Sequence, residues 1–228
     1  MGYDELPAGD TSQVARIYQE MKWKIIFGRY RPGMDISEAT LARVFGASRT
    51  PVREALSRLS ADGYVVSFPG RGFAVAPITI SMVQNIFQLR RILETAAAET
   101  AASVATHEEI LEMQRAAEYS CTGAEEDGYR LAIASNIDFH LAVAKATHND
   151  LLADSVESCL LQVYRILLLG GDFARFEEGT AAHHHAIVDA IESRDPCGAR
   201  EAMEHHISRG ADVIMGNLIE GRIKGVVF

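Results

Sequence analysis

The chain has 228 residues, of which 48% are hydrophobic and 7% aromatic, and this composition suits a globular protein of two modest domains and excludes a disordered one. No uninterrupted apolar run approaches the roughly 20 residues of a membrane span, the acidic N-terminus is unlike a signal peptide, and the three cysteines form no CxxC pair, so we expect a cytoplasmic protein without a membrane partner. A formal net charge of −9 excludes a chain that is basic throughout.

The charge is unevenly distributed along the chain. Residues 11–76 carry ten basic and five acidic residues, a net charge of +5, whereas residues 77–228 carry 12 basic and 23 acidic residues, a net charge of −11. Residues 1–10 hold three acidic residues and no basic one, and we expect them to be disordered. A basic N-terminal module on an acidic body indicates contact with phosphate groups at one end of the chain only.

The basic module begins with two predicted helices. Residues 11–28 form the first, which has a Thr-Ser pair as its N-cap, apolar residues at helical spacing, and Gly28 at its end. Residues 37–45 form the second and shorter helix, which Gly46 ends.

A third helix begins at Ser48, in the sequence S-R-T-P-V-R-E-A-L-S-R-L. The spacing i, i+3, i+4, i+7 places four apolar residues on one face, namely Val52, Ala55, Leu56 and Leu59. Arg49, Thr50 and Arg53 lie off this stripe, near the N-terminal end. Such a helix suits the DNA major groove, where Arg reads guanine edges and the hydroxyls of Ser48 and Thr50 hold phosphates. Taken alone, it could also be a surface helix with solvated arginines.

Two predicted strands follow these helices. Residues 64–68 and 73–76 are β-branched and aromatic, and the turn between them contains Gly70 and Arg71. This pattern predicts a two-stranded wing with Arg71 at its tip. The glycines of the turn allow the backbone to approach a phosphate or enter a minor groove.

Residues 13–77 resemble the winged helix-turn-helix of the GntR family of bacterial transcription regulators. The matching pieces are Pro32-Gly33, Leu41-Ala42, Ser48 to Leu56, Leu59, Asp62-Gly63-Tyr64 and Gly70-Arg71-Gly72. The resemblance implies contacts with double-stranded DNA at Arg49, Thr50, Arg53, Gly70 and Arg71, and Arg43 is a further candidate for a contact with the DNA backbone. Because the family binds short palindromic operators as dimers, the resemblance also implies a homodimer.

After a linker at residues 77–80, the rest of the chain predicts only helices. Six are expected, joined by short links, at residues 80–105, 107–120, 125–147, 150–169, 174–193 and 196–220. Short links predict antiparallel neighbours. The fold is therefore expected to be mainly α, with a winged helix-turn-helix at residues 11–76 and an antiparallel all-helical bundle at residues 81–222.

Three histidines of the bundle fall on apolar helix faces. His140, His184 and His206 each lie at helical spacing from apolar residues of a different predicted helix. A single histidine in such a place is more often an ordinary core residue. Three of them on three helices favour a metal site inside the bundle, because neutral imidazole is the commonest metal ligand.

The bundle resembles the FCD effector domain of the FadR-like GntR subfamily. The matching segments are Arg90 to Glu94, Asn136 to His140, His184 to Ile191 and Ala202 to His206. The resemblance implies a divalent metal ion (Zn, Ni or Mn) that helps to bind a small carboxylate effector, with the ligands Asn136, His140, His184 and His206.

Two of these residues leave alternatives open. The family usually has Asp where this chain has Asn136, which can coordinate through its carbonyl oxygen but brings no charge, so the site would need an anionic effector or water more strongly. Arg90 is the candidate clamp for the effector carboxylate, because Arg pairs bidentately with carboxylates. The alternative is an i, i+4 surface pair between Arg90 and Glu94.

Together these features predict a dimeric, ligand-responsive repressor of transcription rather than an enzyme. The effector would shift the population between conformations that fit the operator and conformations that do not. The alternative is a metal-dependent hydrolase or isomerase at the three-histidine site, but no general base accompanies the histidine faces and the DNA-binding module would be unexplained. A second alternative is a DNA-binding protein whose bundle only dimerises.

Overall fold

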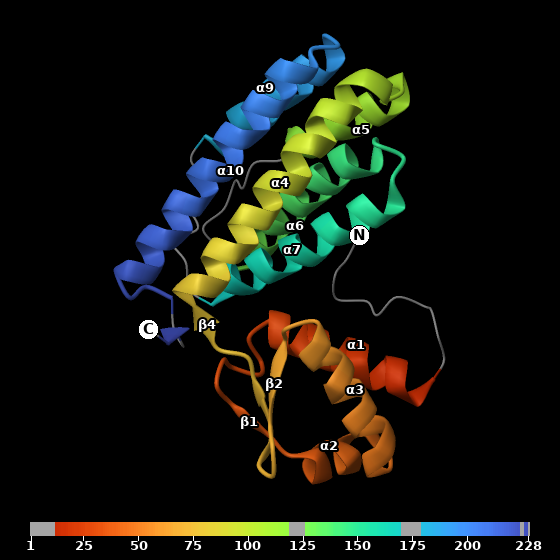
Figure 1. Cartoon of the computed structure of the whole chain (residues 1–228), viewed down its shortest axis with the longest axis vertical. Coiled ribbons are helices and arrows are strands. Elements are labelled where there is room, and N and C mark those ends of the chain that lie inside the picture. The colour runs from red at the N-terminus through yellow and green to blue at the C-terminus, as the bar shows by residue number, and fades with distance from the viewer. Residues whose placement is uncertain (1–11, 119–125, 170–178, 224–225, 228) are drawn as a thin grey trace. The chain divides into compact units, whose positions relative to one another are not determined.

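The computed structural model describes residues 12–118, 126–169, 179–223 and 226–227 (Figure 1). Two compact units make up the chain: Met1–Thr79 together with Lys224–Phe228, and Ile80–Ile223. The predicted disordered segment 1–10, and the first residues of the helices predicted from 125 and 174, lie outside the described residues.

The described part of the N-terminal unit contains the three predicted helices: α1 (Gln13–Ile26), α2 (Glu38–Phe45) and α3 (Arg49–Ala61). Ser12 caps α1 by accepting a hydrogen bond from the Ala15 N–H at 3.1 Å. Gly46 ends α2 in the left-handed conformation, with a φ of 61°, which glycine adopts without strain. The apolar faces meet in a core in which α1 and α2 pack against α3, with buried Ile17, Met21, Leu41, Leu56 and Leu59.

The two predicted strands of the wing belong to a sheet that contains one further strand. β2 (Val65–Phe68) and β3 (Gly72–Val75) pair antiparallel as expected, with Ser67 opposite Phe73. A further strand, β1 (Asp35–Ile36), which was not predicted, pairs with the other edge of β3, so the sheet has three strands in the order β1-β3-β2. Two residues are too few to show strand periodicity, and the pairing of β1 depends on a strand far along the sequence.

The predicted linker at residues 77–80 contains a short strand. β4 (Ile78–Thr79) pairs in parallel with β5 (Val226–Val227), which follows the last helix of the chain. Helix α4 begins directly after β4, at Ile80. The chain therefore returns to the N-terminal unit after completing the C-terminal one.

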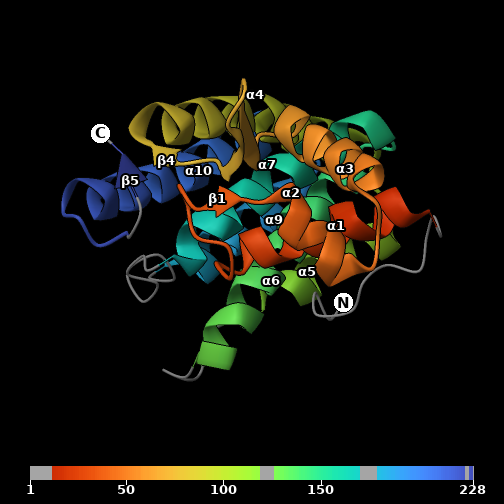
Figure 2. The same cartoon turned by 90° about the horizontal axis from the view of Figure 1, so that it is seen from below.

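The described part of the C-terminal unit contains helices alone, in agreement with the predicted all-helical bundle (Figures 1 and 2). They are α4 (Ile80–Val104), α5 (His107–Ala117), α6 (Glu126–Lys145), α7 (Asp150–Leu168), α9 (Thr180–Glu192) and α10 (Pro196–Ile219). Helix α4 contacts α6, α7, α9 and α10, and its buried alanines let these neighbours approach closely. Within the described ranges we find no helix with the length and hydrophobicity to cross a membrane.

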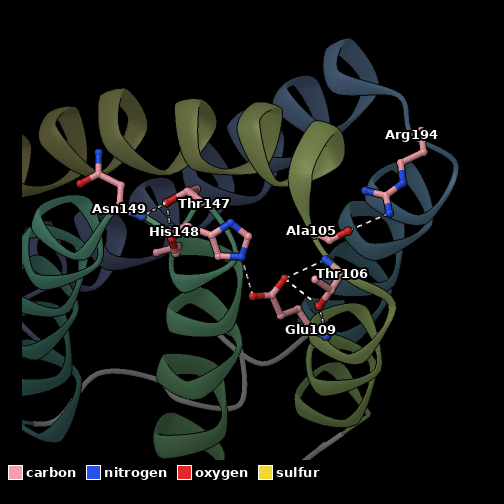
Figure 3. Close-up of polar contacts among 8 residues, drawn as sticks. Ala105, Thr106, Glu109, Thr147, His148, Asn149 and Arg194 are labelled. Carbon is pink, nitrogen blue, oxygen red and sulfur yellow. Dashed lines mark hydrogen bonds and ion pairs between the residues drawn. The ribbon is translucent and has the colours of Figure 1, made fainter.

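The turns at one end of the bundle tie its helices together (Figure 3). Glu109 of α5 forms a capping box with Thr106, whose backbone N–H donates to Glu109 Oε2 at 2.7 Å. The other carboxylate oxygen lies 2.9 Å from Nε2 of His148, in the turn after α6. Arg194, in the turn between α9 and α10, donates to the Ala105 carbonyl oxygen at 2.7 Å. These contacts hold the ends of the helices that carry the three predicted histidine ligands.

Candidate functional site

Three buried histidines meet inside the C-terminal unit. His140 of α6, His184 of α9 and His206 of α10 are 1%, 3% and 7% exposed, and one ring nitrogen of each lies within 4.8 Å of those of the other two. His140 Nε2 and His206 Nε2 are 3.0 Å apart. We call these three residues the histidine cluster. Three imidazoles this close, from three helices, could hold a metal ion.

The neighbouring histidines of the sequence lie outside the cluster. His185 and His205 are exposed and His183 is half-buried, because consecutive residues of a helix point about 100° apart. His183 packs against His205, with ring centroids 4.9 Å apart. Inside the unit, Phe139 stacks on the His184 ring at a centroid distance of 3.8 Å, which restricts that ring's orientation.

A buried ion pair on α4 adjoins the histidine cluster. Arg90 Nε donates to Glu94 Oε1 at 2.6 Å, and both side chains are 3% exposed or less. Glu94 Oε2 in turn lies 2.5 Å from His140 Nδ1. A carboxylate at this nitrogen favours the tautomer with the proton on Nδ1, which leaves the Nε2 lone pair directed toward the rest of the cluster.

Two positions were predicted for Arg90, a clamp for the effector carboxylate and a surface pair with Glu94, and the structure combines features of both. The i, i+4 pair with Glu94 is present, but it is buried rather than on the surface. At the same time Arg90 Nη2 lies 3.5 Å from His140 Nε2, so the guanidinium group also borders the histidine cluster.

Burial and neighbouring charges set the protonation of these groups. Burial by itself raises the pKa of Glu94, but Arg90 and His140 outweigh it and hold this pKa well below its usual range. Burial lowers the pKa of His184 and His206 well below the usual value, and it lowers the pKa of His140 although Glu94 opposes the change. The cluster therefore offers neutral imidazoles beside an ionised carboxylate, and neutral imidazole is the form that binds metal.

Several polar atoms of the predicted ligand residues lack hydrogen-bond partners. Within the described ranges, Asn136 Oδ1, His184 Nε2 and His206 Nδ1 are buried and have no hydrogen-bond partner. Asn136 lies one helical turn before His140 on α6, on the same face. A buried acceptor without a partner costs about 1–3 kcal/mol, and a metal ion would remove that cost. The donor set of imidazole nitrogens and one amide oxygen fits a divalent ion of the Zn, Ni or Mn type.

The sequence reasoning missed the contact between Glu94 and His140. A signal was present, because Arg90 and Glu94 fall at helical spacing within the buried stripe of Phe87, Ala97 and Ala101. It also passed over Arg165 and Gln162 of α7 and Asn217 of α10, which are all buried. Arg165 stands in an apolar run from Leu160 to Leu168, and that position is a signal of burial.

The predicted DNA-contacting residues all lie exposed on the N-terminal unit. They are Arg43 of α2, Ser48, Arg49, Thr50 and Arg53 at the start of α3, and Gly70 and Arg71 of the wing turn. Ser48 is the N-cap residue of α3, but its hydroxyl makes no capping hydrogen bond. A hollow beside α2, α3 and the wing is lined by residues that include Glu38, Arg53, Ser57, Gly70 and Arg71.

Arg53 has a partner that the sequence did not predict. Its Nε and Nη2 donate to the two carboxylate oxygens of Glu38, both at 3.0 Å. Arg53 remains 69% exposed, whereas Glu38 is 16% exposed. The pair holds the Arg53 guanidinium group in one plane at the edge of the hollow.

Comparisons with known proteins match both units. Residues 13–75 match the family described as bacterial regulatory proteins, gntR family, and residues 85–209 match the FCD domain. The HTH-type transcriptional repressor RspR of Escherichia coli (strain K12) is 26% identical over 192 residues, which cover 84% of each chain. The Uxu operon regulator of Haemophilus influenzae is 30% identical over 211 residues, which cover 84% of this chain and 78% of that protein. The solved structure of E. coli McbR/YncC shares the fold, with a TM-score of 0.71 at 21% identity, over 92% of this chain and all of that one.

Proposed function

The chain belongs to the GntR family of bacterial transcription regulators, in the group with an FCD domain, and from this premise we propose that it is a repressor controlled by a small carboxylate at a metal centre. As a member of this family it is a regulator and not an enzyme, which removes the hydrolase or isomerase alternative. The name of the relative RspR, a transcriptional repressor, supports repression as the direction of control.

The observation that carries the proposal is the meeting of three buried imidazoles from three helices. His140, His184 and His206 supply nitrogen ligands, and the orphaned Oδ1 of Asn136 supplies an oxygen. When bound, the metal ion provides a Lewis-acidic centre for a carboxylate oxygen. Arg90, at the border of the cluster, orients the bound carboxylate.

Operator binding is assigned to the exposed residues of the N-terminal unit. In this proposal, Arg49 and Arg53 of α3 read base edges. The DNA phosphates are contacted by the remaining candidates, which are Arg43, Ser48, Thr50, and Gly70 and Arg71 of the wing. Two copies of the chain related by a two-fold axis would bind the two halves of a palindromic operator. The effector acts only if it has different affinities for the conformations that do and do not fit the operator.

The test uses His184→Ala combined with His206→Ala. We expect this double variant to lose metal and the response to carboxylates, while the metal-free protein still binds DNA selected by the wild type from a random pool. Elemental analysis and fluorescence anisotropy measure the two properties. The exposed His185→Ala is the matched control and should behave as the wild type. Stoichiometric metal in the double variant would show that the ligands lie elsewhere.

A further inference from the structure

The charges around the histidine cluster cancel before any metal ion binds. The ionised Glu94 and the Arg90 guanidinium group form a pair with a distance of 2.6 Å and no net charge. The three imidazoles are buried, and imidazole binds a metal ion in its neutral form, so they add no charge. Asn136, on the same face of α6 as His140, is a neutral amide. Glu94 is the carboxylate that contacts His140, and Arg90 already balances its charge.

A divalent ion at this place would therefore add two uncompensated positive charges to a buried site. Burying an unpaired charge is costly, whereas a fully paired one is tolerated. A monocarboxylate would neutralise one of the two positive charges, and an aspartate at position 136 would neutralise the other. With Asn136 in that position, a ligand with two negative charges is needed to reach neutrality.

Arg90 gives the second negative charge a place to bind. Its Nη2 lies 3.5 Å from His140 Nε2, the nitrogen that faces the cluster, and 3.4 Å from Glu94 Oε2. A metal-bound carboxylate and a carboxylate paired with Arg90 would therefore be only a few ångströms apart. This closeness requires a short carbon chain between the two groups.

We propose that the effector of this regulator is a short dicarboxylate, which places one carboxylate on the metal ion and the other against Arg90, and that Asn136 sets this preference over monocarboxylates. The inference rests on the metal centre of the proposed function. It differs from that function by naming the charge of the ligand and the residue that selects it.

The test compares malonate with acetate on the full-length protein. The protein is loaded with Zn²⁺, freed of unbound metal by desalting, and titrated calorimetrically with each ligand at constant ionic strength. We expect the wild type to bind malonate at least about tenfold more tightly than acetate. In Asn136→Asp this ratio should fall toward one, because the new carboxylate neutralises one charge. Asn85→Asp adds the same charge at an exposed position of α4 and should keep the ratio of the wild type.

A second measurement needs no variant. Since linkage is reciprocal, malonate should raise the Zn²⁺ affinity of the wild type at least about tenfold more than acetate does, as measured by competition with a chelating dye. Equal binding of the two ligands, an unchanged ratio in a folded Asn136→Asp variant, or removal of the zinc by malonate would overturn the inference. One zinc ion per chain with equal ligand binding overturns the dicarboxylate inference alone. Absence of zinc in every buffer overturns the metal centre as well.

Discussion

At the scale of single residues, Glu94 determines the electrostatics of the histidine cluster. It is 1% exposed and contacts both Arg90 and His140, so one carboxylate balances a buried cation and orients a candidate ligand. Its pKa is held below the usual range, so it stays ionised at neutral pH. A positioning residue of this kind affects metal affinity without contacting the metal.

Glu94→Gln should therefore weaken Zn²⁺ binding by about 10–100-fold, because the amide is a poorer acceptor for the proton on His140 Nδ1. Glu94→Asp keeps the charge and should retain more of the affinity. Competition with a chelator measures both, and circular dichroism checks that the variants fold. The control is Glu99→Gln. Glu99 lies on the same helix as Glu94, but it is exposed and pairs with Arg200 of α10. Unchanged affinity in Glu94→Gln would rule out the positioning role.

The buried histidines also make a prediction about pH. Because burial lowers the pKa of His184 and His206 in the folded protein, the unfolded chain binds more protons below a pH of about 6.5. Their contribution to stability is present above that pH and is lost as the pH falls. The free energy of unfolding of the metal-free protein should drop by about 1.4 kcal/mol per pH unit for each histidine that gains a proton on unfolding.

Urea unfolding between pH 8 and pH 5 measures this dependence. The variant with both His184 and His206 replaced by Leu should show a shallower slope than the wild type, while His185→Ala should not. A wild-type slope that is flat or of opposite sign, or equal slopes in wild type and double variant, would contradict the assignment of neutral buried imidazoles.

At the scale of elements, the start of α3 combines the proposed recognition surface with a supporting ion pair. Arg53 is exposed but donates two hydrogen bonds to the carboxylate of Glu38 on α2, which fix the orientation of its guanidinium group. An exposed pair of this kind contributes little to folding stability, on the order of 0–1 kcal/mol. Its effect is therefore expected in binding rather than in stability.

Arg53→Ala should lower operator affinity by about 1–3 kcal/mol, roughly 5- to 150-fold, and relax the sequence preference at one base pair. Metal content and the stability of the bundle should not change. Arg58→Ala is the matched control, since Arg58 lies on the same helix, is exposed, and pairs with Glu54 at 2.8 Å. Fluorescence anisotropy measures the affinity for the DNA that the wild type selects from a random pool. Unchanged affinity in Arg53→Ala would show that Arg53 is not part of the recognition surface.

Helices were predictable from the sequence because their apolar residues repeat locally. The described helices of both units follow from spacing and end signals such as Gly46 and Asp195-Pro196. Strands β1, β4 and β5 were not predictable, since each has two residues and a partner far along the sequence. The three histidines that the structure brings together were also predictable from their helical spacing. The contact between Glu94 of α4 and His140 of α6 was not, because it joins two different helices.

At the scale of the whole molecule, the chain joins a basic unit to an acidic one. Residues 11–76 carry a net charge of +5 and residues 77–228 one of −11, so phosphate attraction is confined to the winged unit. Control by an effector then depends on a difference in its affinity between two conformations of the chain. The proposed binding of the effector, its charge and its effect on DNA binding all depend on the metal centre.

The most direct test is therefore elemental analysis of the full-length protein, purified without chelators and without an affinity tag that binds metal. The account predicts about one ion of Zn, Ni or Mn per chain, and none in the variant that lacks both His184 and His206. A wild-type protein that is free of metal, and that takes up none when it is dialysed against each of these ions, would contradict the metal centre and with it the proposed route of control.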